Sequence, residues 1–191
     1  MKFDADFVKR QLLDIAKRNS NCFEEYTTII KSCCTKLMST GMDLYGMFWP
    51  EPILAKYFEY KGKLTSNNDK KNFIYYFDTE NKLRITERYD SNGELLNYIF
   101  YYYYDNLIEI IWYNVKRKVI TTTGFINYEC GILSSYVESY DLEITLKNNL
   151  SIKSYHGYLY NVDKEYIIHK IYSEEIYNDG RIFEKITKIK K

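Results

Sequence analysis

The sequence predicts an α+β protein in which two amphipathic helices precede a large antiparallel β-meander. In the first part of the chain apolar residues recur at three- and four-residue spacing, the period of a helix with one buried face. Further along, short apolar runs are separated by turn residues without intervening helices, as in antiparallel sheets. The 191 residues include 22 Tyr and 10 Phe but only 8 Gly and 2 Pro. Because aromatic side chains suit a pleated surface, this composition also favours sheet.

Two helices are expected at the N-terminal end. The first should be capped by Asp4 and run until the polar stretch 19–21. The second should begin at Asn21, where Glu24 completes a capping-box-like pair, and end near Gly41. The apolar positions are Phe7 or Val8, Leu12, Ile15 and Ala16 in the first helix and Phe23, Tyr26, Ile30, Cys33 and Leu37 in the second.

The meander is expected to contain about ten strands and to form a strongly curved sheet or a partly closed barrel. Tight turns are indicated by pairs that tolerate positive φ angles, such as Asn92-Gly93 and Cys130-Gly131. The segments with strand character are 55–61, 72–78, 82–90, 94–104, 107–114, 118–127, 132–140, 142–147, 150–160, 165–172 and 181–189.

The chain has no obvious linker, so we expect one domain over residues 1–191. Its helical part should span 1–54 and its meander 55–191. Residues 41–52 are apolar but contain two Gly and two Pro, which predicts a connector packed on the core, with a binding surface around Trp49 as the alternative. The polar stretch 65–72 is predicted to be a surface loop between the two parts.

Charge and the start of the chain restrict the classes of function. Acidic residues near Met1 argue against a signal peptide, and no apolar run is long enough to cross a membrane, so we expect a cytoplasmic protein without a membrane partner. The net charge of +1 argues against a nucleic-acid partner. The four cysteines lack CxxC spacing and are predicted to be buried thiols. Residues 72–146 hold six Lys or Arg and eleven Asp or Glu, a net charge of −5.

Several turns share a pattern in which a Tyr precedes Asp or Asn, further turn residues and an apolar strand. It starts most clearly at Tyr89 and Tyr177, and in looser form at Tyr104, Tyr113 and Tyr160. Asp or Asn can bond the turn backbone, and Gly can take the strained position. The pattern resembles the YD repeats of Rhs-type and teneurin shells and the short hairpins of immunity proteins from bacterial polymorphic-toxin systems. The resemblance implies a protein that binds and occludes a toxin, without catalytic residues.

Residues able to support catalysis are scarce, so we expect no enzyme, cofactor or metal ion. His156 and His169 are the only histidines and should lie on neighbouring strands, but they lack HxH or HExxH spacing and an evident third ligand. They are therefore interpreted as structural. Cys130 lies on a predicted turn without an assignable base. Glycine-rich phosphate loops are absent from the sequence.

The leading hypothesis is a non-enzymatic immunity protein whose exposed, acidic, tyrosine-rich sheet face binds a cognate protein toxin domain. Phe100–Tyr104 are five consecutive aromatics, so alternation places rings on both faces of this strand. Tyrosine is enriched where proteins bind. The alternatives are a lipocalin-like carrier of small apolar ligands in a closed barrel and an enzyme built around His156 and His169. A homodimer is also possible if a long edge strand such as 94–104 is unpaired. The predicted binding residues are Tyr101, Tyr103, Trp112, Glu129, Glu138, Asp141 and Glu143.

Overall fold

The structure is a computed structural model that describes residues 4–41, 62–144, 150–160, 166–173 and 182–188. The predicted strand 55–61, most of the predicted connector 41–52 and the turn that starts at Tyr177 lie outside these residues. The chain forms two compact units. Unit 1 comprises Met1–Ser20, Tyr102–Ile111 and Val119–Lys191, and unit 2 comprises Asn21–Tyr101 and Trp112–Lys118. The prediction of a single domain stays a prediction.

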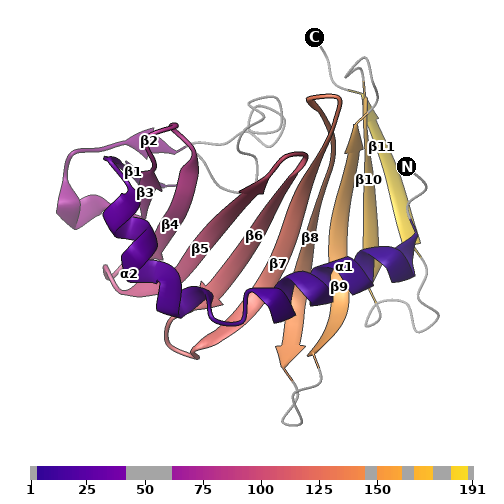
Figure 1. The fold of residues 1–191 in the computed structure, drawn as a ribbon, viewed down its shortest axis with the longest axis horizontal. Coiled ribbons are helices and arrows are strands. Elements are labelled where there is room, and N and C mark those ends of the chain that lie inside the picture. Colours follow the sequence, from indigo (N-terminus) through magenta and orange to yellow (C-terminus); the bar gives the residue numbers. More distant parts are fainter. Residues whose placement is uncertain (1–3, 42–61, 145–149, 161–165, 174–181, 189–191) are drawn as a thin grey trace. The chain divides into compact units, whose positions relative to one another are not determined.

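The fold is α+β, as predicted: two helices and a large antiparallel sheet (Figure 1). The strands follow one another in the hydrogen-bonded order β11-β10-β9-β8-β7-β6-β5-β4-β3-β1-β2. In the described part of the chain β11 and β2 stand at opposite ends of this order, so the sheet is not closed into a barrel. The alternative of an apolar ligand carrier, which assumed a closed barrel, stays a prediction.

Unit 1 contains helix α1 and the strands of the C-terminal half. Their bounds are Ala5–Arg18 for α1, Leu107–Asn114 for β6, Val119–Glu129 for β7, Ile132–Ile144 for β8, Leu150–Tyr160 for β9, Tyr166–Ser173 for β10 and Ile182–Lys188 for β11. The carboxylate of Asp4 accepts the backbone N–H groups of Asp6 and Phe7, which confirms the predicted cap. Predicted strands 132–140 and 142–147 are one strand, because β9 pairs with β8 beyond residue 141.

Helix α1 packs on one face of this sheet (Figure 1). Its predicted apolar positions Val8, Leu12, Ile15 and Ala16 are all buried, whereas Phe7 is exposed. The Thr123 hydroxyl on β7 donates to the carbonyl of Leu12 at 3.0 Å, and the Thr123 N–H donates to the Ser139 hydroxyl at 2.8 Å. These contacts define the helix face of unit 1. Strand alternation places Glu138 on the opposite face.

Unit 2 contains helix α2 and the strands of the first half of the sheet. Their bounds are Cys22–Ser32 for α2, Thr35–Thr40 for β1, Lys63–Leu64 for β2, Phe73–Phe77 for β3, Leu83–Tyr89 for β4 and Leu95–Tyr104 for β5. A 3-10 turn, Asn68–Lys70, lies in the polar loop predicted at 65–72. Strands β5 and β6 contribute residues to both units.

The second helix is shorter than predicted. It ends at Ser32 instead of near Gly41, because Cys33 takes an extended conformation and β1 then pairs with β3, for instance Met38 with Ile74. The expected capping box also does not form, since the Asn21 side chain makes no cap hydrogen bond. Pairing with a distant strand has thus overridden the helical spacing of the apolar residues around Leu37.

The turn at Asp90–Glu94 forms as the repeated pattern predicts. One carboxylate oxygen of Asp90 accepts the backbone N–H groups of Asn92 and Glu94, both at 2.8 Å. Gly93 has a φ of +80°, which glycine adopts without steric cost. The Asp and Gly of this pattern therefore serve the turn itself.

Candidate binding surface

Two turns of unit 1 lie side by side and form what we call the turn edge, Tyr104–Asn106 together with Glu129–Ile132. The first turn joins β5 to β6 and the second joins β7 to β8. They are held together by the Tyr128 N–H, which donates to the Asn106 carbonyl at 2.9 Å. The second turn is tight, because Cys130 and Gly131 have φ angles of +51° and +75°, as predicted for this pair.

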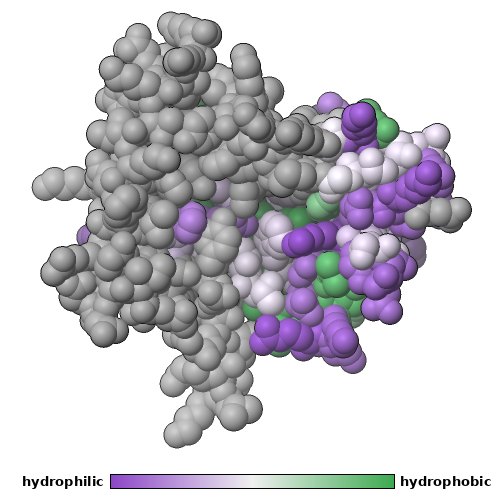
Figure 2. Space-filling model, turned by 180° about the vertical axis from the view of Figure 1, so that it is seen from behind, coloured by the Kyte–Doolittle hydropathy of each residue, from purple (hydrophilic) through white to green (hydrophobic). Residues whose placement is uncertain are grey.

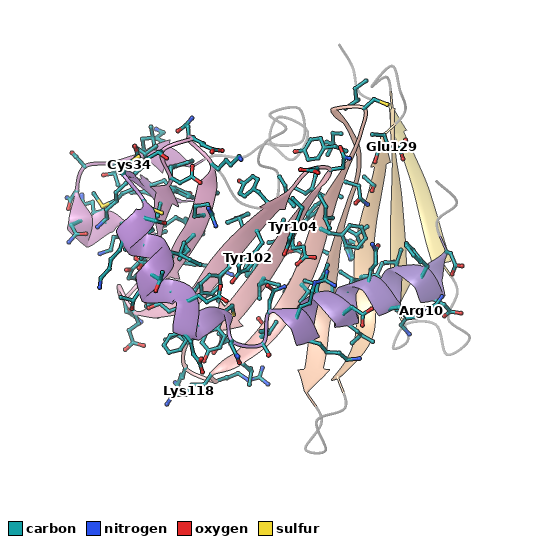
Figure 3. The ribbon with its side chains drawn as sticks, viewed as in Figure 1. Arg10, Cys34, Tyr102, Tyr104, Lys118 and Glu129 are labelled. Atoms are coloured by element: carbon teal, nitrogen blue, oxygen red, sulfur yellow. The ribbon has the colours of Figure 1, made fainter. Side chains whose placement is uncertain are left out.

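The turn edge combines exposed apolar groups with negative charge. Tyr104 is 53% exposed and Ile132 is 46% exposed. Asp105 and Glu129 are also exposed, and no residue of the turn edge is basic. Figure 3 labels Tyr104 at the end of β5 and Glu129 at the end of β7. Aromatic and acidic groups exposed together are suited to a basic protein surface with an apolar centre.

The structure does not unite the seven predicted binding residues on one exposed face. Tyr101 is 2% exposed and Glu138 is 1% exposed, so the expectation that they lie on an open surface was wrong. Strand alternation shows that a residue faces away from its neighbour, but not whether that face is covered. Glu129 is exposed, as expected, and Tyr103 and Trp112 are partly exposed.

Three other predicted binding residues lie outside the turn edge. Trp112 belongs to unit 2, where the Arg88 guanidinium lies 5.9 Å from the centre of its ring. Asp141 and Glu143 lie in β8, and their side chains are outside the described part of the structure. Sequence reasoning missed Tyr104, Asp105 and Ile132 as surface residues. For Tyr104-Asp105 the available signal was the turn pattern, which places both at a hairpin tip.

A buried carboxylate in unit 1 anchors the end of α1. Glu109 on β6 is 1% exposed and accepts hydrogen bonds from the Arg18 guanidinium and, at 3.0 Å, from the side-chain amide of Asn19. The hydrogen bond to Glu109 raises the pKa of Arg18. The Asn19 amide also donates to the Ile15 carbonyl at 2.9 Å. These hydrogen bonds join the C-terminal end of α1 to β6. We therefore assign Glu109 a structural role, which is to fix the last turn of α1 on the sheet.

A second buried carboxylate, Glu87 in unit 2, is surrounded by tyrosines. Its two oxygens accept the hydroxyl protons of Tyr26 from α2 and of Tyr89, the latter at 2.7 Å. The rings of Tyr26 and Tyr98 lie 4.2 Å apart. Burial, reinforced by the hydrogen bond to Glu87, raises the pKa of Tyr26 and Tyr89 above the usual tyrosine value. The cluster binds α2 to the sheet through a polar contact.

The four cysteines are free thiols and only partly match the expectation of burial. Cys22 is buried and Cys33 is half-buried, whereas Cys34 and Cys130 are exposed. Burial raises the pKa of the Cys22 thiol to about 12, so little thiolate forms there near neutral pH.

This difference predicts the order of thiol modification. At about pH 8 an alkylating reagent should modify Cys34 and Cys130 rapidly and leave Cys22 intact, because the thiolate is the reactive form. Peptide mass spectrometry after timed quenching would measure the order, and denatured protein, in which all four should react, is the control. Modification of folded Cys22 as fast as Cys130 would contradict the placement of α2.

Figure 2 shows the molecule from behind, and in the described part of that face hydrophobic side chains occur in small groups between hydrophilic ones. Neither helix of the described residues has the length and apolar character needed to cross a membrane. Among the side chains that the structure describes, no group of three or more His, Cys, Asp and Glu residues could hold a metal ion.

No protein-family model matches the sequence, and no curated protein matches it. Among solved structures, the chain is similar to a protein of unknown function from Bacteroides fragilis. That similarity has 16% sequence identity and a TM-score of 0.42, and it covers 63% of this chain and 94% of the other.

Proposed function

We propose that this chain is a non-enzymatic binding protein that uses the turn edge to hold a basic partner protein. The observation that carries the proposal is the exposure of Tyr104 and Ile132 in two turns that also expose Asp105 and Glu129 and that contain no basic residue of their own. Interfaces commonly place aromatic and apolar anchors at the centre and charged groups at the rim. The acidic rim would steer a positively charged partner into position and exclude acidic ones.

In its finer form, the proposal is that the partner is the cognate toxin domain of a bacterial polymorphic-toxin system, and that the chain is its cytoplasmic immunity protein. The turn pattern around Tyr89 and the net charge of −5 over residues 72–146 support this form. A toxin that acts on nucleic acid would have a basic surface, because it must approach phosphates. Covering that surface with an acidic edge would neutralise it without any catalysis.

The test begins with the protein encoded immediately upstream of this chain, coexpressed and then measured by calorimetric titration. Reversing two charges with Asp105→Lys and Glu129→Lys should weaken binding by at least tenfold, and added salt should weaken wild-type binding. Glu24→Lys, a reversal at an exposed position of α2, is the matched control and should leave affinity unchanged. Failure of the upstream product to bind would refute the toxin form. Binding that is indifferent to both edge substitutions would refute the turn edge as the interface.

A further inference from the structure

The face of unit 2 opposite α2 carries hydrogen-bond donors on β4 and β6, with β5 between these two strands (Figure 1). Thr86 on β4 pairs with Ile99 on β5. The Val115 N–H donates to the Leu96 carbonyl at 3.0 Å, and this bond sets the register that places Ile99 opposite Trp112 on β6. Thr86 and Trp112 therefore belong to one row across the sheet, with Ile99 in the middle.

Arg88 lies on the same face, two residues after Thr86 along β4. Alternation turns both side chains away from α2, because Glu87 between them bonds Tyr26 of that helix. The guanidinium carbon of Arg88 lies 5.9 Å from the centre of the Trp112 ring, although the two residues are two strands apart. The Arg88 side chain therefore extends across β5. A guanidinium beside an aromatic ring keeps its N–H donors at its edge.

Two donors in this row are buried and have no hydrogen-bond partner in the described part of the structure, namely the Thr86 hydroxyl and the Trp112 indole N–H. Thr86 is 0% exposed, whereas Trp112 and Arg88 are partly exposed and can be reached from solvent. Buried polar groups are almost always hydrogen-bonded, and an exception indicates a bound water, ion or other functional group. Because an indole N–H can only donate, the partner that Trp112 needs is an acceptor.

The surroundings of these donors are positively charged. Arg88 makes no ion pair among the residues that the structure describes. Its paired neighbours Phe73 and Asn97 are uncharged, and so is Tyr75, which pairs with Thr86. A half-buried cation without a carboxylate beside it favours a negatively charged acceptor over a neutral one.

We propose that Arg88, Trp112 and Thr86 bind an oxyanion, the carboxylate or phosphate group of a small ligand. Hydrogen bonds from a guanidinium to an oxyanion are charge-assisted and can be bidentate, which makes them stronger than neutral ones. Ligand sites combine mostly apolar walls with a few placed polar groups, and aromatic residues line this face. All three residues belong to unit 2, whereas the turn edge belongs to unit 1. The site therefore does not depend on the proposed partner protein.

A different explanation is that water molecules bond the Thr86 hydroxyl and the Trp112 N–H, while Arg88 only covers the indole ring. Buried waters commonly satisfy such groups. This arrangement predicts that the surroundings of Trp112 are the same at every anion concentration. An oxyanion site predicts a saturable change at Trp112 that depends on the charge of Arg88.

Fluorescence can follow Trp112 alone, because the chain has two tryptophans and Trp49→Phe removes the other. Inorganic phosphate and acetate are the probes, each titrated at about pH 7 in exchange for sodium chloride at constant ionic strength. We expect the Trp112 emission to change and to saturate with at least one of them. Tighter binding of phosphate would assign the site to phosphate-bearing ligands, and tighter binding of acetate to carboxylates. The absence of a saturable response to both probes would overturn the proposal.

Substitutions test the donors separately. Arg88→Gln should weaken binding of the preferred anion by at least tenfold, and Thr86→Val, which keeps the shape of the side chain, by at least threefold. Arg117→Gln removes an exposed charge from a turn of unit 2 and is the matched control that should leave the affinity unchanged. Circular dichroism identifies variants that fail to fold. In that case proton NMR of the wild-type protein decides, because the anion should shift the indole N–H signal that Trp112→Phe removes. Unchanged affinity in a folded Arg88→Gln variant would refute the site.

Discussion

Replacing Arg18 by alanine is expected to lower the free energy of unfolding by about 2–4 kcal/mol. The substitution removes the charged partner Arg18 from Glu109, a carboxylate that is 1% exposed and would keep the hydrogen bond from the neutral side chain of Asn19. A buried carboxylate without charge compensation is costly, because it has left water without an equivalent replacement. Half of the Arg18 side chain is exposed, which keeps the loss below that of a fully buried pair. Denaturant unfolding followed by circular dichroism would measure it.

The neighbouring residue offers a matched control. Lys17 lies in the same last turn of α1, and its ammonium is 3.9 Å from Asp14 with both side chains mostly exposed. Lys17→Ala should therefore change stability by less than about 0.5 kcal/mol. Glu109→Gln should lower the free energy of unfolding by less than Arg18→Ala does, because it removes the buried charge and leaves Arg18 within reach of water. Equal effects of Arg18→Ala and Lys17→Ala would show that Glu109 does not depend on this partner.

The sequence was sufficient to predict the fold class and most of the strands. The strand bounds at β3, β5 and β6 agree to within one residue, because Gly, Asn and Asp mark the intervening turns. It was insufficient for β1. Thr35–Thr40 follows a helical pattern without interruption, and only its pairing with β3, more than thirty residues away, makes it a strand. Such pairing is a long-range property that local periodicity does not contain.

The burial of the candidate binding residues also depends on long-range structure that local periodicity does not contain. The exposed position of Glu129 follows from its turn, which is a local signal. The burial of Tyr101 and Glu138 depends on what covers each face, and alternation along a strand is silent on that point. The alignment of Glu138 with His156 requires the register between β8 and β9. The sequence placed the two histidines on neighbouring strands but did not determine the register between those strands.

The Glu87 cluster gives the other large expected effect. Glu87→Ala should lower the free energy of unfolding by about 2–4 kcal/mol, because it removes the acceptor of two tyrosine hydroxyls and leaves space inside unit 2. Helix α2 should suffer most, since Tyr26 bonds to Glu87 and, of the residues in α2, only Cys22 is fully buried. Hydrogen exchange across residues 22–32, together with denaturant unfolding, would measure both effects. Glu80→Ala, which removes an exposed carboxylate paired with Lys82, should be nearly neutral.

The ionisation of Tyr26 and Tyr89 at alkaline pH shows whether Glu87 stabilises unit 2 through its hydrogen bonds or through packing alone. Tyr26 and Tyr89 have a raised pKa in the folded protein, so the neutral hydroxyl is favoured by folding. Their stabilising contribution is therefore complete below about pH 10, the unfolded value, and is lost as the pH rises through the folded values. In Glu87→Gln the negative acceptor is absent, and these tyrosines should ionise at lower pH than in the wild type. A tyrosinate absorbance titration of the two proteins measures this difference. Identical titration curves would mean that Glu87 does not hold the two hydroxyls, and the stability loss in Glu87→Ala would then reflect packing alone.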